Sequence, residues 1–464
     1  MKNRTIIIII FLVLSVSCTS VQIQDTIDDI QSKSSHFLHE QGIVVKNDPA
    51  KDFDVTPYRT NTPDKQATSI STSLNNSVFS NPEANLQVLV TTLLKGIDDP
   101  VRQAKILHDW IALNISYNVI AFSNGEIPDQ SYSSVLKSKK AVCEGYSNLY
   151  LKMCSLAKIK CQKVSGYARG VGFNPLSQDT SLDSNHAWNA VFLNGNWYLV
   201  DTTWDAGHVT GCYKTSYSYA KRYSTSYFLL DPMAMLHTHF PSTPMWQLLN
   251  RQLSRNEFLS LPYLTGDFFD SVEATEPTIS AINIVANSAT LRLRSKAGKA
   301  LSAFLSDEKG SILESSTLIT YYDGFSQIQI AFPKAGSYSL QLFAGQIGKT
   351  HSSIGEIVYS ASSGSELVFP EQYDSSIGNN YKIFSPLTGN LKTNKETIFL
   401  LSIPNIKTAY IAYNKEFLPM LASEDGNFYL KLTPTKKGDK IMVLLPSESR
   451  KGSYESILSY SVVD

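Results

Sequence analysis

The chain has 464 residues, of which 41 are Lys or Arg and 41 are Asp or Glu, so its formal net charge is zero. Proteins that attract nucleic acid present an excess of positive charge, and no nucleic-acid partner is expected. Hydrophobic residues make up 42% of the chain and charged residues 18%, which excludes a wholly disordered or coiled-coil protein and, at about 150 residues per domain, predicts around three domains.

The N-terminus has the pattern of an export signal. Two basic residues precede an almost unbroken apolar run over residues 6–16, and a serine stands directly before Cys18. The run is shorter than the roughly 20 residues that a membrane-spanning helix needs, so residues 1–17 are interpreted as a signal peptide. The small residue before cysteine resembles the lipobox of bacterial lipoproteins, although Ser15 stands where that motif usually has leucine. We expect lipidation of Cys18 and a membrane-anchored protein of the cell envelope, in the periplasm, at the outer membrane or on the cell surface; a plain signal peptide is the alternative.

Residues 18–80 are rich in Ser, Thr, Asp, Asn and Gln and have few clustered apolar residues, which predicts a flexible tether behind the lipid anchor. Order is expected from about Asn81. Apolar residues then recur at spacings of three and four over 82–94, and again after Pro100. This pattern predicts two amphipathic helices, followed by a polar loop, at the start of a folded domain that comprises residues 81–271.

A third helix is predicted where apolar and aromatic residues recur at helical spacing from Tyr146 to Ala157, with Cys143 at the N-terminal end. The positive end of the helix dipole and the unpaired backbone N–H groups favour a thiolate there. The same N–H groups suit the oxyanion that forms when a carbonyl is attacked. Cys143 is therefore a candidate nucleophile; an inert buried cysteine is the alternative.

Residues 185–192 and 197–204 are predicted to be two strands, because the Asn194-Gly195 pair between them is a strong hairpin signal. In that hairpin the numbers of facing residues add up to 389, so Asp201 lies opposite residue 188 and on the same face as His186. The two side chains are then diagonal neighbours, about 7–8 Å apart and within reach of each other. A core histidine paired with an aspartate is the alternative for these two residues, but it does not account for the cysteine.

Cys143, His186 and Asp201 together are the groups that an activated nucleophile requires. In such a set the cysteine attacks, the histidine accepts its proton, and the aspartate orients the imidazole and stabilises its charged form.

The sequence around these three residues resembles the transglutaminase-like superfamily, in the branch related to the kyphoscoliosis peptidase. The motifs are Val-Cys143-Glu-Gly-Tyr, Asn-His186-Ala-Trp-Asn and Trp-Tyr-Leu-Val-Asp201-Thr-Thr-Trp, and the likeness extends over residues 82–270. The resemblance implies an α+β, papain-like core with the nucleophile on a central helix packed against an antiparallel sheet. It also implies a thioester acyl-enzyme resolved by water, as in a cysteine peptidase or amidase, or by an amine, as in a transglutaminase-like acyltransferase. Cys143, His186 and Asp201 are its implied catalytic residues, and no cofactor is implied.

The sequence does not fix the roles of several other residues of the first domain. Trp110 and Tyr117 are candidates for a second oxyanion donor, with a packing role favoured for Trp110. Cys154, Cys161 and Cys212 have no assigned role. Two of them can form one disulfide, and the sequence does not determine which two. His237 and His239 have the spacing of metal ligands, but the sequence supplies no acidic or cysteine partners near them, so a structural role is favoured and no metal is expected.

After about residue 272 the sequence changes to short alternating runs separated by Gly, Ser, Asn and Pro, which is typical of β-sandwiches. Asp323-Gly324 and Gly336 recur as Asp425-Gly426 and Gly438, each at an offset of 102. An offset near 100 fits one sandwich per repeat. Two Ig-like domains are predicted, at 272–364 and 365–464.

Two classes of function follow from the sequence. The first is a cell-envelope thiol enzyme that acts on amide bonds of a protein or peptide, including a cell-wall or surface polypeptide. The second is a non-catalytic binding or scaffold module that keeps the fold.

Overall fold

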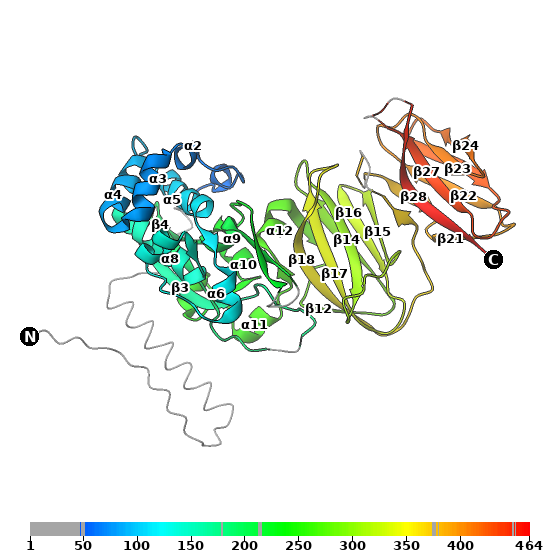
Figure 1. Ribbon diagram of the computed structural model, residues 1–464. Coiled ribbons are helices and arrows are strands. Elements are labelled where there is room, and N and C mark those ends of the chain that lie inside the picture. Colours follow the sequence, from blue (N-terminus) through cyan, green and yellow to red (C-terminus); the bar gives the residue numbers. More distant parts are fainter. Residues whose placement is uncertain are drawn as a thin grey trace, which may run out of the picture.

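The computed structural model describes residues 47, 52–177, 180–211, 216–373, 377–378, 380–447, 450 and 452–464. Three parts follow one another along the molecule: a mixed helix and sheet domain and then two β-sandwiches, with the helical end and the C-terminus at opposite ends (Figure 1). The predicted signal peptide, Cys18 and Cys212 lie outside the described residues. Within the described part of the chain, no helix is long and apolar enough to cross a membrane.

The first domain packs its central helix against one face of an antiparallel sheet, and the short helix α10 packs on the opposite face with Trp188 and Leu199. Helix α8 packs against strands β3 and β4 and against helices α4, α5 and α7, and its buried face consists mainly of Tyr146, Leu149, Tyr150 and Met153. From residue 82 on, its α-helices are α4 (Pro82–Leu93), α5 (Pro100–Asn114), α6 (Val119–Asn124), α7 (Tyr132–Ser138), α8 (Cys143–Leu156), α9 (Thr202–Ala206), α10 (Pro232–Met235), α11 (Arg255–Leu259) and α12 (Gly266–Ser271). The five-stranded sheet has the order β8-β5-β4-β3-β9, with β3 (Cys161–Ala168), β4 (His186–Leu193), β5 (Asn196–Val200), β8 (Phe228–Leu230) and β9 (His239–Pro241).

The predicted tether is wrong for residues 52–80. This segment forms η2 (Thr56–Tyr58), α2 (Lys65–Thr68) and α3 (Thr72–Ser80), and its Ala67 and Val78 are buried in the core that surrounds α8. Arg59 adds an ion pair to Asp270 at 2.7 Å. The apolar residues of this segment are isolated in the sequence, so its composition resembles a linker even though these residues pack on the core of the first domain.

The hairpin register is confirmed, because Leu193 faces Asn196 and Asn189 faces Val200. The second strand is shorter than predicted: β5 ends at Val200, and the chain then enters α9. The reason is local, since the Asp201 side chain accepts hydrogen bonds from the backbone N–H groups of Thr203 at 2.8 Å and Trp204 at 3.2 Å. A side chain that satisfies the first N–H groups of a turn starts a helix there.

The predicted fold class is confirmed, because the remainder of the chain forms two sandwiches with equivalent topology. One sheet of the first sandwich has the order β11-β13-β16-β15 and its counterpart in the second has β20-β22-β26-β25. In each facing sheet the last long strand, β18 or β28, pairs in parallel with an early strand, β12 or β21. The hairpin strands β16 and β26 begin 102 residues apart, at Phe325 and Asn427.

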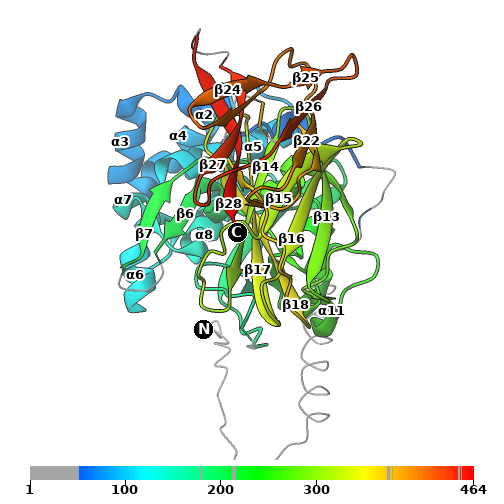
Figure 2. The same ribbon diagram turned by 90° about the vertical axis from the view of Figure 1, so that its right-hand side faces the viewer.

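The strands of the first sandwich are β11 (Val272–Glu276), β12 (Ile282–Val285), β13 (Ser288–Ser295), β14 (Ala300–Asp307), β15 (Thr317–Tyr322), β16 (Phe325–Ala331), β17 (Gly336–Gly345) and β18 (Ser352–Ala361). Those of the second are β19 (Glu371–Gln372), β20 (Lys382–Ser385), β21 (Asn390–Lys392), β22 (Thr397–Ser402), β23 (Tyr410–Tyr413), β24 (Glu416–Pro419), β25 (Leu421–Ala422), β26 (Asn427–Leu432), β27 (Lys440–Pro446) and β28 (Tyr454–Val463). Figure 2 shows these strands from the C-terminal end of the molecule.

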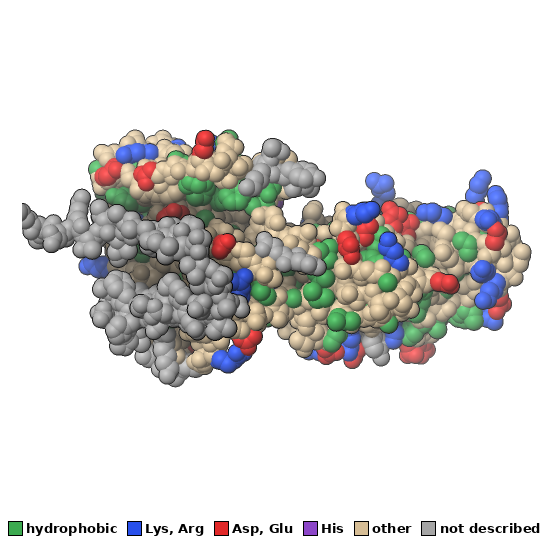
Figure 3. Space-filling model, turned by 90° about the horizontal axis from the view of Figure 1, so that it is seen from below, with side chains coloured by type: hydrophobic (Ala, Val, Ile, Leu, Met, Phe, Trp, Pro, Cys, Tyr) green, Lys and Arg blue, Asp and Glu red, His purple; other side chains and the backbone are tan. Residues whose placement is uncertain are grey.

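The three parts are joined by hydrogen bonds between backbones. Strand β10 (Tyr263–Leu264), at the end of the first domain, pairs with β18 of the first sandwich. The amide of Tyr321 in that sandwich donates to the carbonyl of Tyr381 in the next at 2.7 Å. Figure 3 shows Lys and Arg side chains beside Asp and Glu side chains on the sandwich end of the molecule, in agreement with the balanced composition.

Candidate active site

Cys143 is the first residue of helix α8, as predicted. The segment before it is held in place by Gln130, whose side-chain oxygen accepts from the Val142 amide at 3.0 Å. Gly145 is required by this packing, because a Cβ at that position would lie 2.5 Å from the Gln130 Oε1 atom and 2.8 Å from the Cβ of Ala141. The glycine of the Cys-Glu-Gly motif thus allows the first turn of α8 to approach its support closely.

The thiol of Cys143 makes hydrogen bonds with the His186 ring and with the backbone N–H of Ala187. Burial of the half-buried Cys143 acts to raise the pKa of the thiol, but the charge and hydrogen bond of His186 outweigh burial and lower the pKa below its ordinary value. The matching effect on His186 is a pKa raised to about 10, where burial opposes the rise and Asp201 and Cys143 cause it. A thiolate beside an imidazolium is the arrangement that these shifts favour.

Asp201 lies next to His186, which confirms the contact predicted from the hairpin. The Nε2 atom of His186 is 2.7 Å from the Asp201 Oδ2 atom, and Asp201 is fully buried. Burial acts to raise the pKa of this carboxyl, but the charge of His186 and the hydrogen bonds from His186 and His239 hold it well below its usual range. Since Nε2 of His186 faces Asp201, its Nδ1 atom is the one available to the thiol.

His239 is the residue of this site that the sequence analysis missed. Its Nε2 atom is 3.1 Å from the same Oδ2 atom of Asp201, whereas His237 points elsewhere and its Nδ1 atom lies 3.0 Å from the carbonyl of Pro262. No local signal distinguishes the two histidines, because strand β9 reaches the site only through its pairing with β3.

One group of side chains in the described part of the chain has the composition of a metal site. His186, Asp201 and His239 place one donor atom each within 4.8 Å of one another, and two imidazoles with a carboxylate suit zinc. The direct hydrogen bonds from both rings to Asp201 account for this geometry without an ion.

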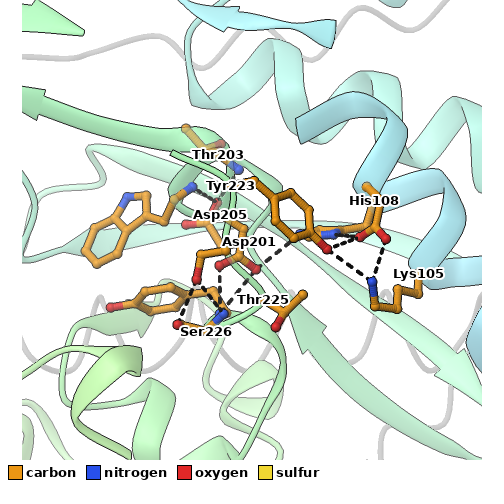
Figure 4. A network of polar contacts seen from close by, with 12 residues as sticks. Lys105, His108, Asp201, Thr203, Asp205, Tyr223, Thr225 and Ser226 are labelled. Atoms are coloured by element: carbon orange, nitrogen blue, oxygen red, sulfur yellow. Dashed lines mark hydrogen bonds and ion pairs between the residues drawn. The ribbon is translucent and has the colours of Figure 1, made fainter. Parts of the chain in front are cut away.

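A second buried network fixes α9, the helix that begins directly after Asp201. His108 of α5 lies 2.9 Å from Asp109 through Nδ1 and 3.1 Å from Asp205 of α9 through Nε2. Asp205 also accepts from the Tyr227 amide at 3.0 Å, and Lys105 is 2.5 Å from Asp109. Figure 4 shows how these groups connect α5 to α9. The network thus joins the helical layer to the end of the sheet where Asp201 lies.

The remaining candidates take different places. Trp110 is fully buried and its Nε1 donates to Asn75 at 3.1 Å, so it packs in the core. Burial raises the pKa of Tyr117, and the Cys143 and Asp201 charges add to the rise, so this phenol lies near the site. Cys154 and Cys161 are free and buried thiols that contact each other.

Comparison with known proteins identifies the family of the first domain. Residues 87–202 match the family model described as the transglutaminase-like superfamily. The chain is 30% identical over 275 residues to kyphoscoliosis peptidase from Mus musculus, which covers 59% of this chain and 40% of that protein. It is 29% identical over 195 residues to Lim and transglutaminase domain protein ltd-1 from Caenorhabditis elegans (41% and 27% of the two chains), and 26% identical over 200 residues to hillarin from Drosophila melanogaster (42% and 24%).

The chain thus spans less than half the length of these curated relatives. Among solved structures, the crystal structure of a TGase matches with a TM-score of 0.21 and 15% identity, over 29% of this chain and 34% of that one. The family model and the curated relatives show that this chain contains a transglutaminase-like domain, and that the chain is similar to kyphoscoliosis peptidase.

Proposed function

We propose that the protein is a thiol enzyme of the cell envelope that acts on amide bonds of proteins or peptides. The observation that carries the proposal is the chain of contacts from Cys143 at the start of α8 through His186 to the buried Asp201. A fold kept for binding alone has no need of a thiol hydrogen-bonded to a histidine whose pKa is raised to about 10.

The chemistry follows from the orientation of His186. The Cys143 Sγ atom attacks the amide carbonyl carbon and forms the C–S bond, while backbone N–H groups at the start of α8 stabilise the oxyanion. The Nδ1–H of His186 then protonates the leaving amine as the C–N bond breaks, and a thioester remains. Water or a primary amine attacks the thioester, His186 accepts its proton, and the acid or the new amide is released with the thiol restored.

The first test concerns the state of the thiol. A free thiol with a pKa near 8.5 is only about 0.3% ionised at pH 6, so iodoacetamide should label Cys143 at pH 6 much faster than a free cysteine. His186→Ala should abolish the acceleration. The buried Cys154 serves as an internal control in the same mass spectrum. Labelling of Cys143 at the rate of an unactivated thiol would refute the proposed function.

The second test separates hydrolysis, transfer and binding. A peptide library is incubated with the protein, with and without a primary amine, and cleaved or amine-linked products are identified by mass spectrometry. Products that disappear in Cys143→Ala support the enzyme. No product in either arm, together with unchanged partner binding by Cys143→Ala, would favour the binding or scaffold module.

The envelope location is proposed from the N-terminal sequence. Lipidation of Cys18 would leave the folded domains outside the cytoplasm, attached to a membrane by the lipid. Globomycin, which blocks lipoprotein signal processing, should cause the precursor to accumulate, and Cys18→Ser should release the protein from the membrane fraction. Processing that ignores globomycin would contradict the lipid anchor and leave the plain signal peptide.

A further inference from the structure

We propose that His239 is a positioning residue of the candidate triad. Its ring donates a second hydrogen bond to Asp201 and holds the carboxylate in the orientation in which it accepts the hydrogen bond from His186. The inference rests on the proposed function, because it assigns His239 a task only if His186 and Asp201 work on Cys143. It goes beyond the Cys-His-Asp set by adding a fourth residue from a distant part of the chain.

The first argument is the hydrogen-bond arrangement of Asp201. Its Oδ1 atom accepts from the amides of Thr203 at 2.8 Å and Trp204 at 3.2 Å. Its Oδ2 atom accepts from His186 at 2.7 Å and from His239 at 3.1 Å. Each oxygen thus has two donors, which is its full capacity. Without His239, Oδ2 would be held only by the imidazole that it has to orient.

The second argument is that the contacts determine which nitrogen of His239 carries the proton. An ionised carboxylate only accepts hydrogen bonds, so the Nε2 atom that faces Asp201 must be the donor. The Nδ1 atom of the same ring lies 2.8 Å from the hydroxyl of Thr238, which donates to it when the ring is neutral. Burial lowers the pKa of His239 to about 4, so the ring is neutral at pH 7 and supplies a donor without a second positive charge.

The third argument is that the surroundings prevent the ring from turning. The His239 ring centroid lies 4.5 Å from that of Trp204, 5.0 Å from Trp188 and 5.5 Å from Tyr227, and the residue is fully buried. Its strand approaches closely because Gly166 on β3 has no side chain; a Cβ there would collide with the backbone of β9. The donor is therefore placed rigidly, which is what a positioning role requires.

The test compares two amides of different length at position 239. The amide nitrogen of Gln can occupy the place of Nε2 and donate to Asp201, whereas that of Asn stops near the place of Nδ1. The readout is the rate of iodoacetamide labelling of Cys143 in the full chain from pH 5 to pH 9. We expect His239→Gln to stay within about twofold of the natural protein. His239→Asn should lower the rate at pH 6 about tenfold, the equivalent of a one-unit rise in the thiol pKa.

Two controls separate positioning from stability. His237→Asn makes the same chemical change two residues away, where the ring contacts Pro262 and not Asp201, and should leave the labelling profile unchanged even if the melting temperature falls. If His239→Asn does not fold, Thr238→Val takes its place, because it removes the hydrogen bond that helps to hold the His239 ring at Nδ1, and the rate at pH 6 should fall.

Opposite outcomes are distinguishable. If Cys143 of the natural protein labels rapidly and His239→Asn labels at the same rate or faster, the role of His239 is overturned but the proposed function is not. A faster rate would mean that His239 only withdraws charge from Asp201. Slow labelling of the natural protein at pH 6 would refute the proposed function and, with it, this inference.

Discussion

Replacement of Asp201 by Asn tests the candidate site most directly, because it removes the charge and leaves the shape. The Asn oxygen can take the place of Oδ1 and accept from the amides of Thr203 and Trp204, and Asn caps a helix about as well as Asp. Helix α9 should therefore survive. The Asn amide group then faces the Nε2 atoms of His186 and His239, so His186 must accept through Nε2 and carry its proton on Nδ1. In that tautomer it cannot accept a proton from Cys143.

The size of the fall in the Cys143 labelling rate follows from the charges that remain in Asp201→Asn. Asp201 is the first of the groups that raise the pKa of His186 to about 10, and without it burial disfavours the imidazolium. A thiol with an ordinary pKa near 8.5 is about 3% ionised at pH 7, so labelling should fall roughly thirtyfold. Turnover should fall further, by a factor on the order of 10⁴, the size known for the same change in a serine protease triad.

Stability gives an independent measure of the same contact. The lost charge-assisted hydrogen bond should cost about 1.5–3 kcal/mol at pH 7. Because the folded protein depresses the pKa of Asp201, this contribution is present above the unfolded pKa of about 3.9 and is lost as the pH falls below it. Denaturant unfolding at pH 7 and near pH 3 should therefore show a difference between Asp201→Asn and the natural protein that shrinks in acid. If Cys143 in Asp201→Asn labels as fast as in the natural protein at pH 6, the reasoning is refuted.

Three further predictions concern pH, packing and the network of Figure 4. Because the pKa of His186 is raised to about 10 and that of Cys143 is lowered, the labelling rate should change less between pH 6 and pH 9 than that of a free thiol, while amide turnover, which needs the protonated histidine, should fall as the pH passes 10; a normal thiol titration near 8.5 would contradict the ion pair. Gly145→Ala should lower the free energy of unfolding by about 1–3 kcal/mol through overpacking, measured in urea, and an unchanged or raised stability would count against the close packing at Gln130. Asp205→Ala should cost about 3–5 kcal/mol because it leaves the Nε2 atom of His108 and the Tyr227 amide without their buried partner, whereas Lys137→Ala, at an exposed ion pair, should change unfolding little.

The sequence alone was sufficient for the parts of the site that depend on local periodicity. Helical spacing after Tyr146 placed Cys143 at the start of a helix, and the Asn194-Gly195 turn set a register that brought His186 to Asp201. Both are short-range patterns, with a period of 3.6 in the helix and 2.0 in the strands. The catalytic roles of these three residues stay predictions until the labelling and product experiments are done.

Other features depend on contacts between distant segments, and the sequence could not show them. The segment 52–80 resembles a linker in composition, and only its packing on the helices of the first domain reveals it as ordered. The end of β5 at Val200 depends on whether Asp201 caps the next turn, a choice between two local hydrogen-bond patterns that the tertiary structure decides.

The sequence by itself determined the domain type, the position of the thiol at a helix end and the pairing of one histidine with one aspartate, because each is encoded by residues within one element or one hairpin. Only the tertiary structure decided that Asp201 is shared by two histidines. His239 lies 38 residues from Asp201 in the chain, and the two meet because β9 pairs with β3 at the edge of the sheet. Such a contact has no periodicity in the sequence, since it is set by strand order and by the small volume of Gly166.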